Sequence, residues 1–104
     1  MPSIRLSKRA RADLVRLRLF IAEKNPRAAQ RAADKIISGI DQLLTFPLLG
    51  RPCPPDSMPA GFRELVIDFG SDGYIILYRV ESDEITIVAM RHQRESGFDL
   101  PVNL

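Results

Sequence analysis

Three apolar runs in the second half of the chain constrain its fold more than any other feature. They cover residues 62–67, 74–80 and 85–94 and follow one another across short polar turns. Each run is rich in β-branched or aromatic residues and is bounded by Gly, Asp or Ser, which is typical of β-strands. We therefore expect a β-meander over residues 62–95. Because each strand carries arginines within it or at its ends, we expect this sheet to bind an anionic group or a large partner.

The first half of the chain predicts a short strand followed by two helices. Residues 4–6 alternate as a strand does, and Ser7 is a suitable N-cap for a helix that runs to about residue 24. Asn25-Pro26 ends this helix and starts a second, which we expect to reach about residue 46. Because almost no linker separates them, the two helices should form an antiparallel hairpin over residues 7–46.

Two apolar stripes mark the first helix. Ala10, Leu14, Leu17 and Ile21 recur at helical spacing and form the main stripe. A second stripe comprises Val15, Leu19 and Ala22. We expect this helix to bury both stripes, one on the sheet and one on the second helix. The alternative is that the second stripe stays exposed as a docking surface.

The segment between the hairpin and the meander, residues 47–61, is dense in proline and should form an irregular loop. Cys53 lies in this loop and is the only cysteine in the chain. A single cysteine excludes an internal disulfide and fits a reducing compartment. With no His nearby, Cys53 is expected to be a small loop residue. Residues 96–104 form a tail that we expect to be ordered against a partner. We expect one domain over residues 1–104.

Charge is distributed unevenly along the chain. Residues 1–35 hold ten of the 15 Lys and Arg residues and three carboxylates, giving a charge of +7, which leaves −5 for the remainder. Such asymmetry would steer an acidic protein or a nucleic acid toward the helical hairpin, although a solvated helix face gives the same pattern. Because most of these cations are arginines, flat and bidentate interface contacts are favoured.

Several classes of protein are excluded. No apolar run approaches the roughly 20 residues of a membrane span, and no secretory signal is recognisable, so we expect a cytoplasmic protein. The chain lacks a phosphate-binding loop, a G-x-S-x-G motif and any Cys/His cluster with metal-ligand spacing. We therefore expect neither a metal nor a cofactor.

Acid–base chemistry through histidine would have to use His92, the only histidine in the chain. Its neighbours Arg91 and Arg94 would disfavour the imidazolium form, as a general base requires, and would bind a scissile phosphate in a metal-free ribonuclease. The alternative is an ordinary polar strand end at the margin of the sheet.

Arg79 lies in a strand whose other residues are apolar. By alternation it shares a face with Ile75 and Leu77. An arginine among aliphatic side chains is usually paired, and Glu64 or Asp68 on the neighbouring strand is the expected partner. Since Arg63 and Glu64 are adjacent, one of them should lie on the face of the sheet without helices.

The order of these segments resembles ParE-type toxins of the RelE/ParE superfamily of bacterial toxin–antitoxin modules, often called plasmid stabilisation proteins. The resemblance spans nearly the whole chain and rests on Asn25-Pro26, Gly50-Arg51-Pro52, Arg63-Glu64-Leu65-Val66, Gly73 to Val80, and Arg91-His92-Gln93-Arg94. It implies an α+β fold of the order β-α-α-β-β-β, with a helical hairpin packed on a small, mainly antiparallel sheet. It also implies an antitoxin that wraps around the toxin.

The two branches of this superfamily imply different chemistry. RelE-like members cleave mRNA on the ribosome, whereas ParE-like members lack the nuclease residues and poison DNA gyrase. This chain has no cation at residues 73–75 and no lysine in the loop 47–61, which favours the ParE-like branch. We therefore expect a non-enzymatic gyrase inhibitor that a cognate antitoxin neutralises. The alternatives are a nuclease and a non-toxic interaction module or inactive remnant.

Candidate functional residues follow from these two interpretations. For a nuclease they are His92 with the possible phosphate ligands Arg63, Arg79, Arg91 and Arg94. For partner binding we expect the hairpin cations Arg9, Arg11, Arg16 and Arg18, the apolar positions left open on the first helix, and Arg63, Arg91 and Arg94 on the meander.

Overall fold

The computed structural model describes residues 2–54, 56–95 and 98. Strand β1 (Ser3–Leu6) leads into the helices α1 (Lys8–Ala22) and α2 (Pro26–Asp41), and a short 3-10 helix, η1 (Gln42–Leu44), follows α2. The remaining elements are the strands β2 (Arg51–Pro52), β3 (Phe62–Phe69), β4 (Asp72–Glu81) and β5 (Glu84–His92).

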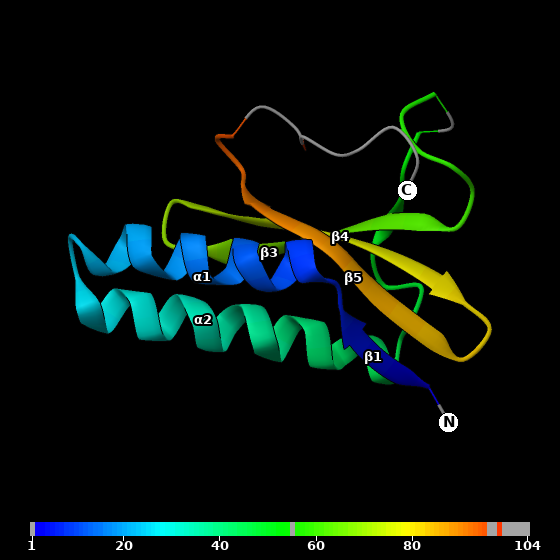
Figure 1. The fold of residues 1–104 in the computed structure, drawn as a ribbon, viewed down its shortest axis with the longest axis horizontal. Coiled ribbons are helices and arrows are strands. Elements are labelled where there is room, and N and C mark those ends of the chain that lie inside the picture. Colours follow the sequence, from blue (N-terminus) through cyan, green and yellow to red (C-terminus); the bar gives the residue numbers. More distant parts are fainter. Residues whose placement is uncertain (1, 55, 96–97, 99–104) are drawn as a thin grey trace.

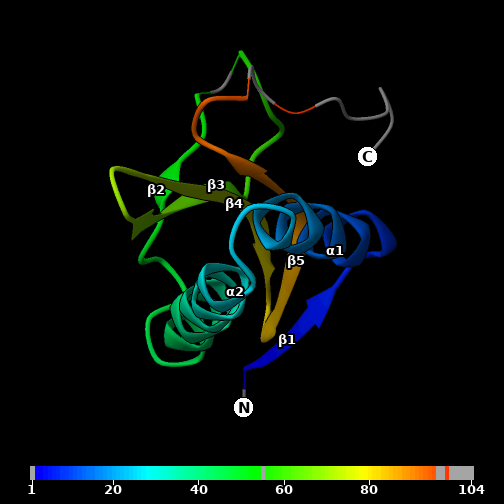
Figure 2. The same cartoon turned by 90° about the vertical axis from the view of Figure 1, so that its left-hand side faces the viewer.

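The five strands form one sheet in the order β1-β5-β4-β3-β2. β3, β4 and β5 form an antiparallel meander, β2 pairs antiparallel with β3, and β1 pairs parallel with β5. Figure 1 shows α1 and α2 running side by side as an antiparallel pair. Seen nearly end-on in Figure 2, they lie against one side of the sheet, and the loop after β2 rises on the other. The predicted α+β fold with a helical hairpin on a mainly antiparallel sheet is confirmed.

Local capping signals explain where the helices begin. The Ser7 hydroxyl accepts the Ala10 N–H at 3.0 Å, and the Asn25 side chain accepts the Ala28 N–H at 3.2 Å. Each bond satisfies one of the free N–H groups in the first turn of its helix. Pro26 occupies the first helical position, where its missing N–H has no consequence.

Three boundaries differ from the sequence prediction. α1 ends at Ala22, two residues early, and the regular α-helix of the second segment ends at Asp41 and continues as η1. The loop 47–61 contains the two-residue strand β2, which lies at the sheet edge, where a proline is tolerated because its missing N–H faces away from the ladder. None of the helices in the described part of the chain is long and apolar enough to span a membrane.

The sheet separates two apolar clusters. The larger lies between the helices and the inner face, defined as the sheet face toward α1 and α2, and includes Leu17, Ile36, Ile76 and Tyr78. The smaller lies on the outer face, away from the helices, and is built on Phe62, Leu77 and Ala89 with Cys53, Met58, Val88 and Phe98 packed against it. β5 has a β-bulge at Val88, because Leu77 pairs with Ala89 whereas Tyr78 pairs with Ile87. The extra residue places the side chains of both Val88 and Ala89 on the outer face.

Candidate functional site

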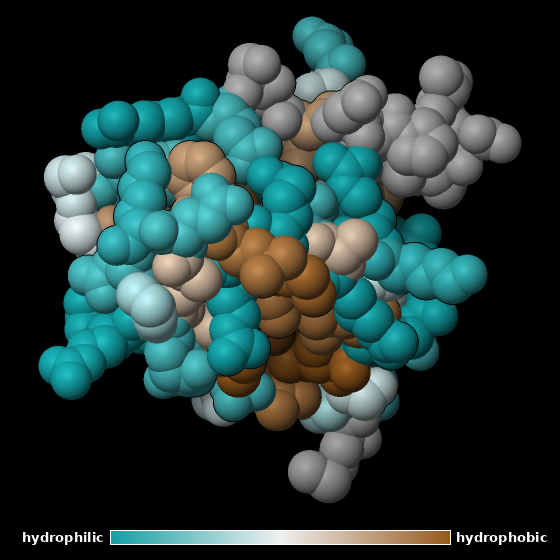
Figure 3. Space-filling view, turned by 60° about the vertical axis from the view of Figure 1, so that its left-hand side comes forward, coloured by the Kyte–Doolittle hydropathy of each residue, from teal (hydrophilic) through white to brown (hydrophobic). Residues whose placement is uncertain are grey.

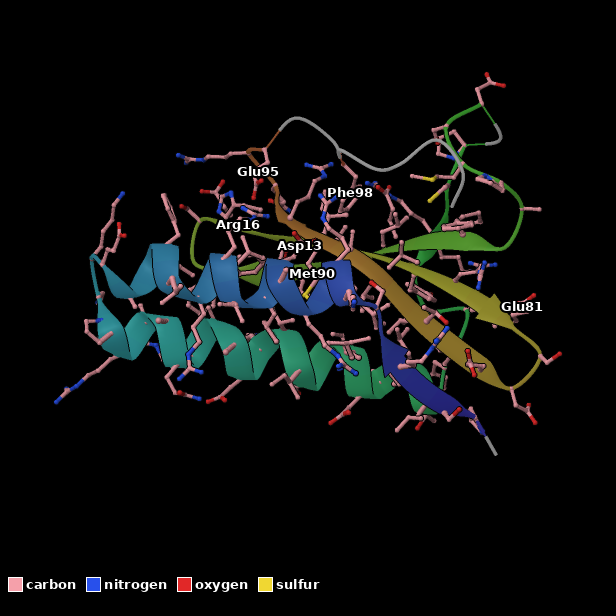
Figure 4. The ribbon with its side chains drawn as sticks, viewed as in Figure 1. Asp13, Arg16, Glu81, Met90, Glu95 and Phe98 are labelled. Atoms are coloured by element: carbon pink, nitrogen blue, oxygen red, sulfur yellow. The ribbon has the colours of Figure 1, made fainter. Side chains whose placement is uncertain are left out.

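The edge of β5 beyond β1 is closed by side chains rather than by a strand. Asp13, which is only 4% exposed, accepts the Met90 N–H through Oδ2 at 2.9 Å. Ser7 donates its hydroxyl to the Val88 carbonyl at 2.7 Å, and the Glu95 carboxylate accepts the His92 N–H at 3.0 Å. Figure 4 shows Asp13 and Arg16 on α1 next to Met90 and Glu95. α1 is therefore bonded directly to the strand edge.

Two of the four hairpin arginines predicted to bind a partner take part in this arrangement. Arg9 lies 3.1 Å from Asp13, and Arg16 lies 3.6 Å from Asp13 and 3.1 Å from Glu95. Burial raises the pKa of Glu95, but the hydrogen bonds from His92 and Arg16 outweigh it and hold that pKa below its ordinary value. Arg9 and Arg16 thus face β5.

The other two hairpin arginines, Arg11 and Arg18, do not contact Asp13 or Glu95 in the described part of the chain. Arg18 donates to the Gln30 side chain of α2 at 3.1 Å, and Arg11 is exposed. On its outward side α1 presents Val15 and Leu19, each about 60% exposed, while the equally exposed Phe20 lies toward Arg16 and the sheet. We call Val15 and Leu19 the apolar strip. The expectation that the second stripe is buried was wrong for Val15 and Leu19, whereas its third member, Ala22, is half-buried, because the core forms on the Leu17 side of α1. Apolar (brown) surface bordered by polar (teal) side chains is visible in Figure 3.

His92 lies at the end of β5 beside a groove of about 490 Å³ between α1 and the sheet. Its ring meets Tyr74 edge-on at 5.6 Å, and its Nδ1 accepts the Arg94 N–H at 3.1 Å. Arg94 reaches Asp72 at 2.9 Å. Burial raises the pKa of Tyr74. The groove has an apolar wall of Leu17, Phe20, Ile21, Phe69 and Tyr74. His92 therefore closes the end of a groove on the inner side of the sheet.

Arg63 lies on the inner face and holds the loop before β2. It donates to the Gly50 carbonyl at 2.6 Å, while the Tyr78 hydroxyl accepts the Gly50 N–H at 2.8 Å and donates to the Pro47 carbonyl at 2.9 Å. A Cβ on Gly50 would lie 2.6 Å from the Glu64 carbonyl oxygen, so only glycine fits there. Arg63 and Tyr78 together fix residues 47–50 against the sheet.

Arg79 and Arg91 lie on the outer face. The predicted pairing of Arg79 with Glu64 or Asp68 was wrong: Arg79 contacts Glu81 at 3.3 Å, and Glu64 pairs with Arg51. Glu81 lies two residues along the same strand and therefore on the same face. Arg51 precedes β3 on the short edge strand, so its pairing with Glu64 could not be read from the meander alone.

The five residues proposed for a nuclease do not gather at one point. Arg79 and Arg91 lie on the outer face, whereas Arg63 and His92 lie on the inner face and Arg94 lies in the turn after β5. Arg63 pairs with Tyr78 and His92 with Tyr74, so even this inner pair is separated by four residues of β4, or about 13 Å.

Other chemistry is not suggested by the described residues. Among them, no group of three or more His, Cys, Asp or Glu side chains is placed to hold a metal ion. Burial, and then the Glu64 carboxylate, raise the pKa of the Cys53 thiol, which disfavours the reactive thiolate.

Sequence reasoning missed Asp13 entirely. Asp13 stands at i+4 from Arg9 and at i−3 from Arg16, which reads as an exposed helix pair. One signal was available, since Asp13 directly precedes Leu14 and falls between Ala10 and Leu17 of the main apolar stripe. A carboxylate on that side of a helix needs a buried donor.

Comparison with known proteins gives consistent matches over the whole fold. The family described as the ParE toxin of the type II toxin-antitoxin system, parDE, matches residues 4–97. Toxin RelE3 of Caulobacter vibrioides is 40% identical over 95 residues, which cover 91% of this chain and 98% of the relative. Toxin RelE1 of the same organism is 31% identical over 93 residues, covering 89% and 95%.

A solved structure supports the same fold. One chain of the chromosomal ParDE TA system from P. aeruginosa superimposes with a TM-score of 0.72 at 24% identity. The match covers 88% of this chain and 96% of the other.

Proposed function

This chain belongs to the ParE toxin family and is a type II toxin of the ParE/RelE superfamily, and from this premise we propose that it arrests growth by binding DNA gyrase. In this proposal the toxin stabilises the state of gyrase in which DNA is cleaved and performs no bond chemistry of its own. Membership of the family implies an antitoxin partner, which would neutralise the toxin until the antitoxin is degraded.

The observation that carries the proposal is the dispersal of the candidate nuclease residues. A general base must lie within hydrogen-bond reach of the proton it removes, and cations that stabilise the same transition state must reach the same phosphate. Arg63 and His92 lie about 13 Å apart along β4, and Arg79 and Arg91 lie on the other face of the sheet. Such a distribution favours a binding protein over a nuclease.

The proposed antitoxin surface is the exposed side of α1. The apolar strip is exposed apolar surface whose burial would favour binding, and the positively charged Arg11 and Arg18 lie beside it. An amphipathic acidic segment would cover the strip and pair with these arginines. Because Arg9 and Arg16 already contact Asp13, we assign them a smaller part in antitoxin binding.

The test is gyrase activity in the presence of the purified chain, separated from its antitoxin. We expect inhibition of supercoiling and accumulation of cleaved DNA, both reversed when antitoxin is added back. Heat-denatured chain is the control. Normal supercoiling at toxin concentrations well above those of gyrase would contradict the proposal.

A ribosome-dependent mRNA endonuclease is the second candidate, and it is favoured by one observation. The relatives from Caulobacter vibrioides carry the name RelE, which matches the nuclease branch of the superfamily. Primer extension on mRNA from translating ribosomes would detect its product. Cleavage between defined codon positions, combined with unaffected gyrase, would favour this alternative over gyrase binding.

A further inference from the structure

The outer face carries two unsatisfied hydrogen-bond donors. Among the side chains that the structure describes, only the Nε atoms of Arg79 and Arg91 are buried nitrogen or oxygen atoms without a hydrogen-bond partner. Buried polar atoms of folded proteins are paired in the large majority of cases, because an unpaired donor loses its hydrogen bonds to water. Both atoms lie on the same face of the same sheet, where an added acceptor could satisfy them.

Arg91 is the better-organised of the two. Its Nη1 donates to the carbonyls of His92 and Glu95, the latter at 2.5 Å, and its guanidinium carbon lies 5.1 Å from the centre of the Phe98 ring. These contacts fix the guanidinium group, and among the described residues none accepts a hydrogen bond from its Nε. Such an edge offers two parallel donors, which match the two oxygens of a carboxylate.

Arg79 repeats this arrangement at the other end of the outer face. Its guanidinium carbon lies 5.9 Å from the centre of the Phe62 ring, and its Nη2 contacts the exposed Glu81 carboxylate at 3.3 Å. Four residues of β4 separate Arg79 from Ile75, the residue paired with Arg91, so the two arginines lie about 13 Å apart. Between them lie Leu77, Val88 and Ala89 of the outer apolar cluster.

The charge of the outer face distinguishes between two kinds of partner. By strand alternation this face carries four arginines and four carboxylates, so their charges cancel: Arg5, Arg51, Arg79 and Arg91 against Glu64, Asp68, Glu81 and Glu84. A nucleic-acid backbone needs a continuous positive track. Separate arginine–aromatic pairs around an apolar centre are instead typical of the central residues of protein interfaces.

We propose that the outer face is the surface that contacts the toxin's protein target, with Arg79 and Arg91 each binding a carboxylate on either side of the apolar centre. The inference rests on the proposed function, in which the target is gyrase, and it assigns target and antitoxin to opposite sides of the fold. Phe98 is half-buried, packs against the outer apolar cluster and lies beside the Arg91 guanidinium, so its ring helps to position that group.

The test measures binding of the full chain to purified gyrase and, separately, to its antitoxin. Arg79→Lys and Arg91→Lys keep the charge but remove the two-donor edge, and we expect each to weaken gyrase binding at least tenfold with antitoxin binding unchanged. Arg5→Lys is the matched control, because Arg5 lies on the same face, has a side chain that is 62% exposed and pairs with the exposed Glu84. We expect it to bind like the wild type.

Thermal melting of each variant, together with Phe98→Ala, separates loss of binding from loss of folding. Phe98→Ala keeps both arginines and should also weaken gyrase binding, since it removes the ring that positions Arg91. Folded Arg79→Lys and Arg91→Lys chains that bind gyrase as tightly as the wild type would overturn the inference and leave the proposed function intact. A wild-type chain that does not bind gyrase would overturn both. Tight binding of a short DNA duplex, lost in Arg91→Lys, would replace the protein partner with nucleic acid.

Discussion

The carboxylate of Asp13 accepts the backbone N–H of Met90 across 77 residues of sequence, at 2.9 Å and almost out of contact with water. The bond joins α1 to β5 at the point where β1 no longer covers the strand edge. Since the β-bulge at Val88 and Ala89 lies immediately before Met90, Asp13 also helps to fix the register that directs Arg91 to the outer face and His92 to the inner face.

The first prediction concerns Asp13. Asp13→Leu removes the acceptor and leaves the Met90 N–H buried and unpaired, so we expect the free energy of unfolding to fall by about 2–3 kcal/mol. Asp13→Asn keeps an acceptor oxygen and loses only ion pairs with half-exposed arginines, so its cost should be about 1 kcal/mol or less. Urea denaturation compares the two. Equal losses would mean that the charge of Asp13, rather than its hydrogen bond, stabilises the fold.

How far the sequence predicts this fold depends on whether a signal is local. Ser7 and Asn25 act within three residues of themselves, so the start of each helix was predictable. The meander was predictable because alternation and turn residues recur within a few positions. The partner of Arg79 was not predictable, because Glu64 instead pairs with Arg51, which lies on a strand only two residues long. The partner of Asp13 was not predictable either, because no residue near position 13 indicates that a strand edge near residue 90 will lie beside it.

The second prediction concerns Tyr78, which fixes the loop before β2. Tyr78→Phe removes a hydroxyl that bonds both Pro47 and Gly50, and it leaves the buried Gly50 N–H without an acceptor. We expect a loss of about 1–3 kcal/mol in urea denaturation. Tyr74→Phe is the control, because the Tyr74 ring is equally buried and its hydroxyl bonds no other described residue. A Tyr74→Phe loss as large as that of Tyr78→Phe would show that the hydroxyl bonds to the loop contribute little.

The third prediction is a pH dependence at Glu95. Its pKa is lowered in the folded chain, so its stabilising contacts with His92 and Arg16 are fully present above its unfolded pKa and are lost as the pH falls through the folded value. We expect wild type to be more stable than Glu95→Gln at neutral pH, with the difference shrinking below about pH 4.5. Because the Glu95 side chain is 39% exposed, the effect should be small and should weaken in high salt. A difference that is constant from pH 7 to pH 3 would contradict the assignment.

The fourth prediction separates the two candidate activities at His92. Its Nδ1 accepts the Arg94 backbone N–H and its ring packs on Tyr74, while the Arg94 guanidinium pairs with Asp72 and Arg91 lies on the outer face. We therefore expect His92→Ala to retain growth inhibition on expression, whereas a nuclease that uses this base would lose it by about a hundredfold or more. Colony counts after induction measure the effect, and immunoblotting confirms equal expression. Loss of toxicity by a folded His92→Ala chain would favour the nuclease.

The fifth prediction concerns the antitoxin. Leu19→Asp introduces a carboxylate into the apolar strip, where it would be desolvated against an acidic and apolar segment, so antitoxin binding should weaken at least tenfold. Stability should change little, because Leu19 is 60% exposed in the free chain. Leu48→Asp is the matched control: Leu48 is 63% exposed but lies in the loop after η1 rather than on α1. Isothermal titration of antitoxin into each chain measures both. Equal affinities would mean that the exposed side of α1 does not bind the antitoxin, and a selective loss in Leu48→Asp would move the interface to the loop.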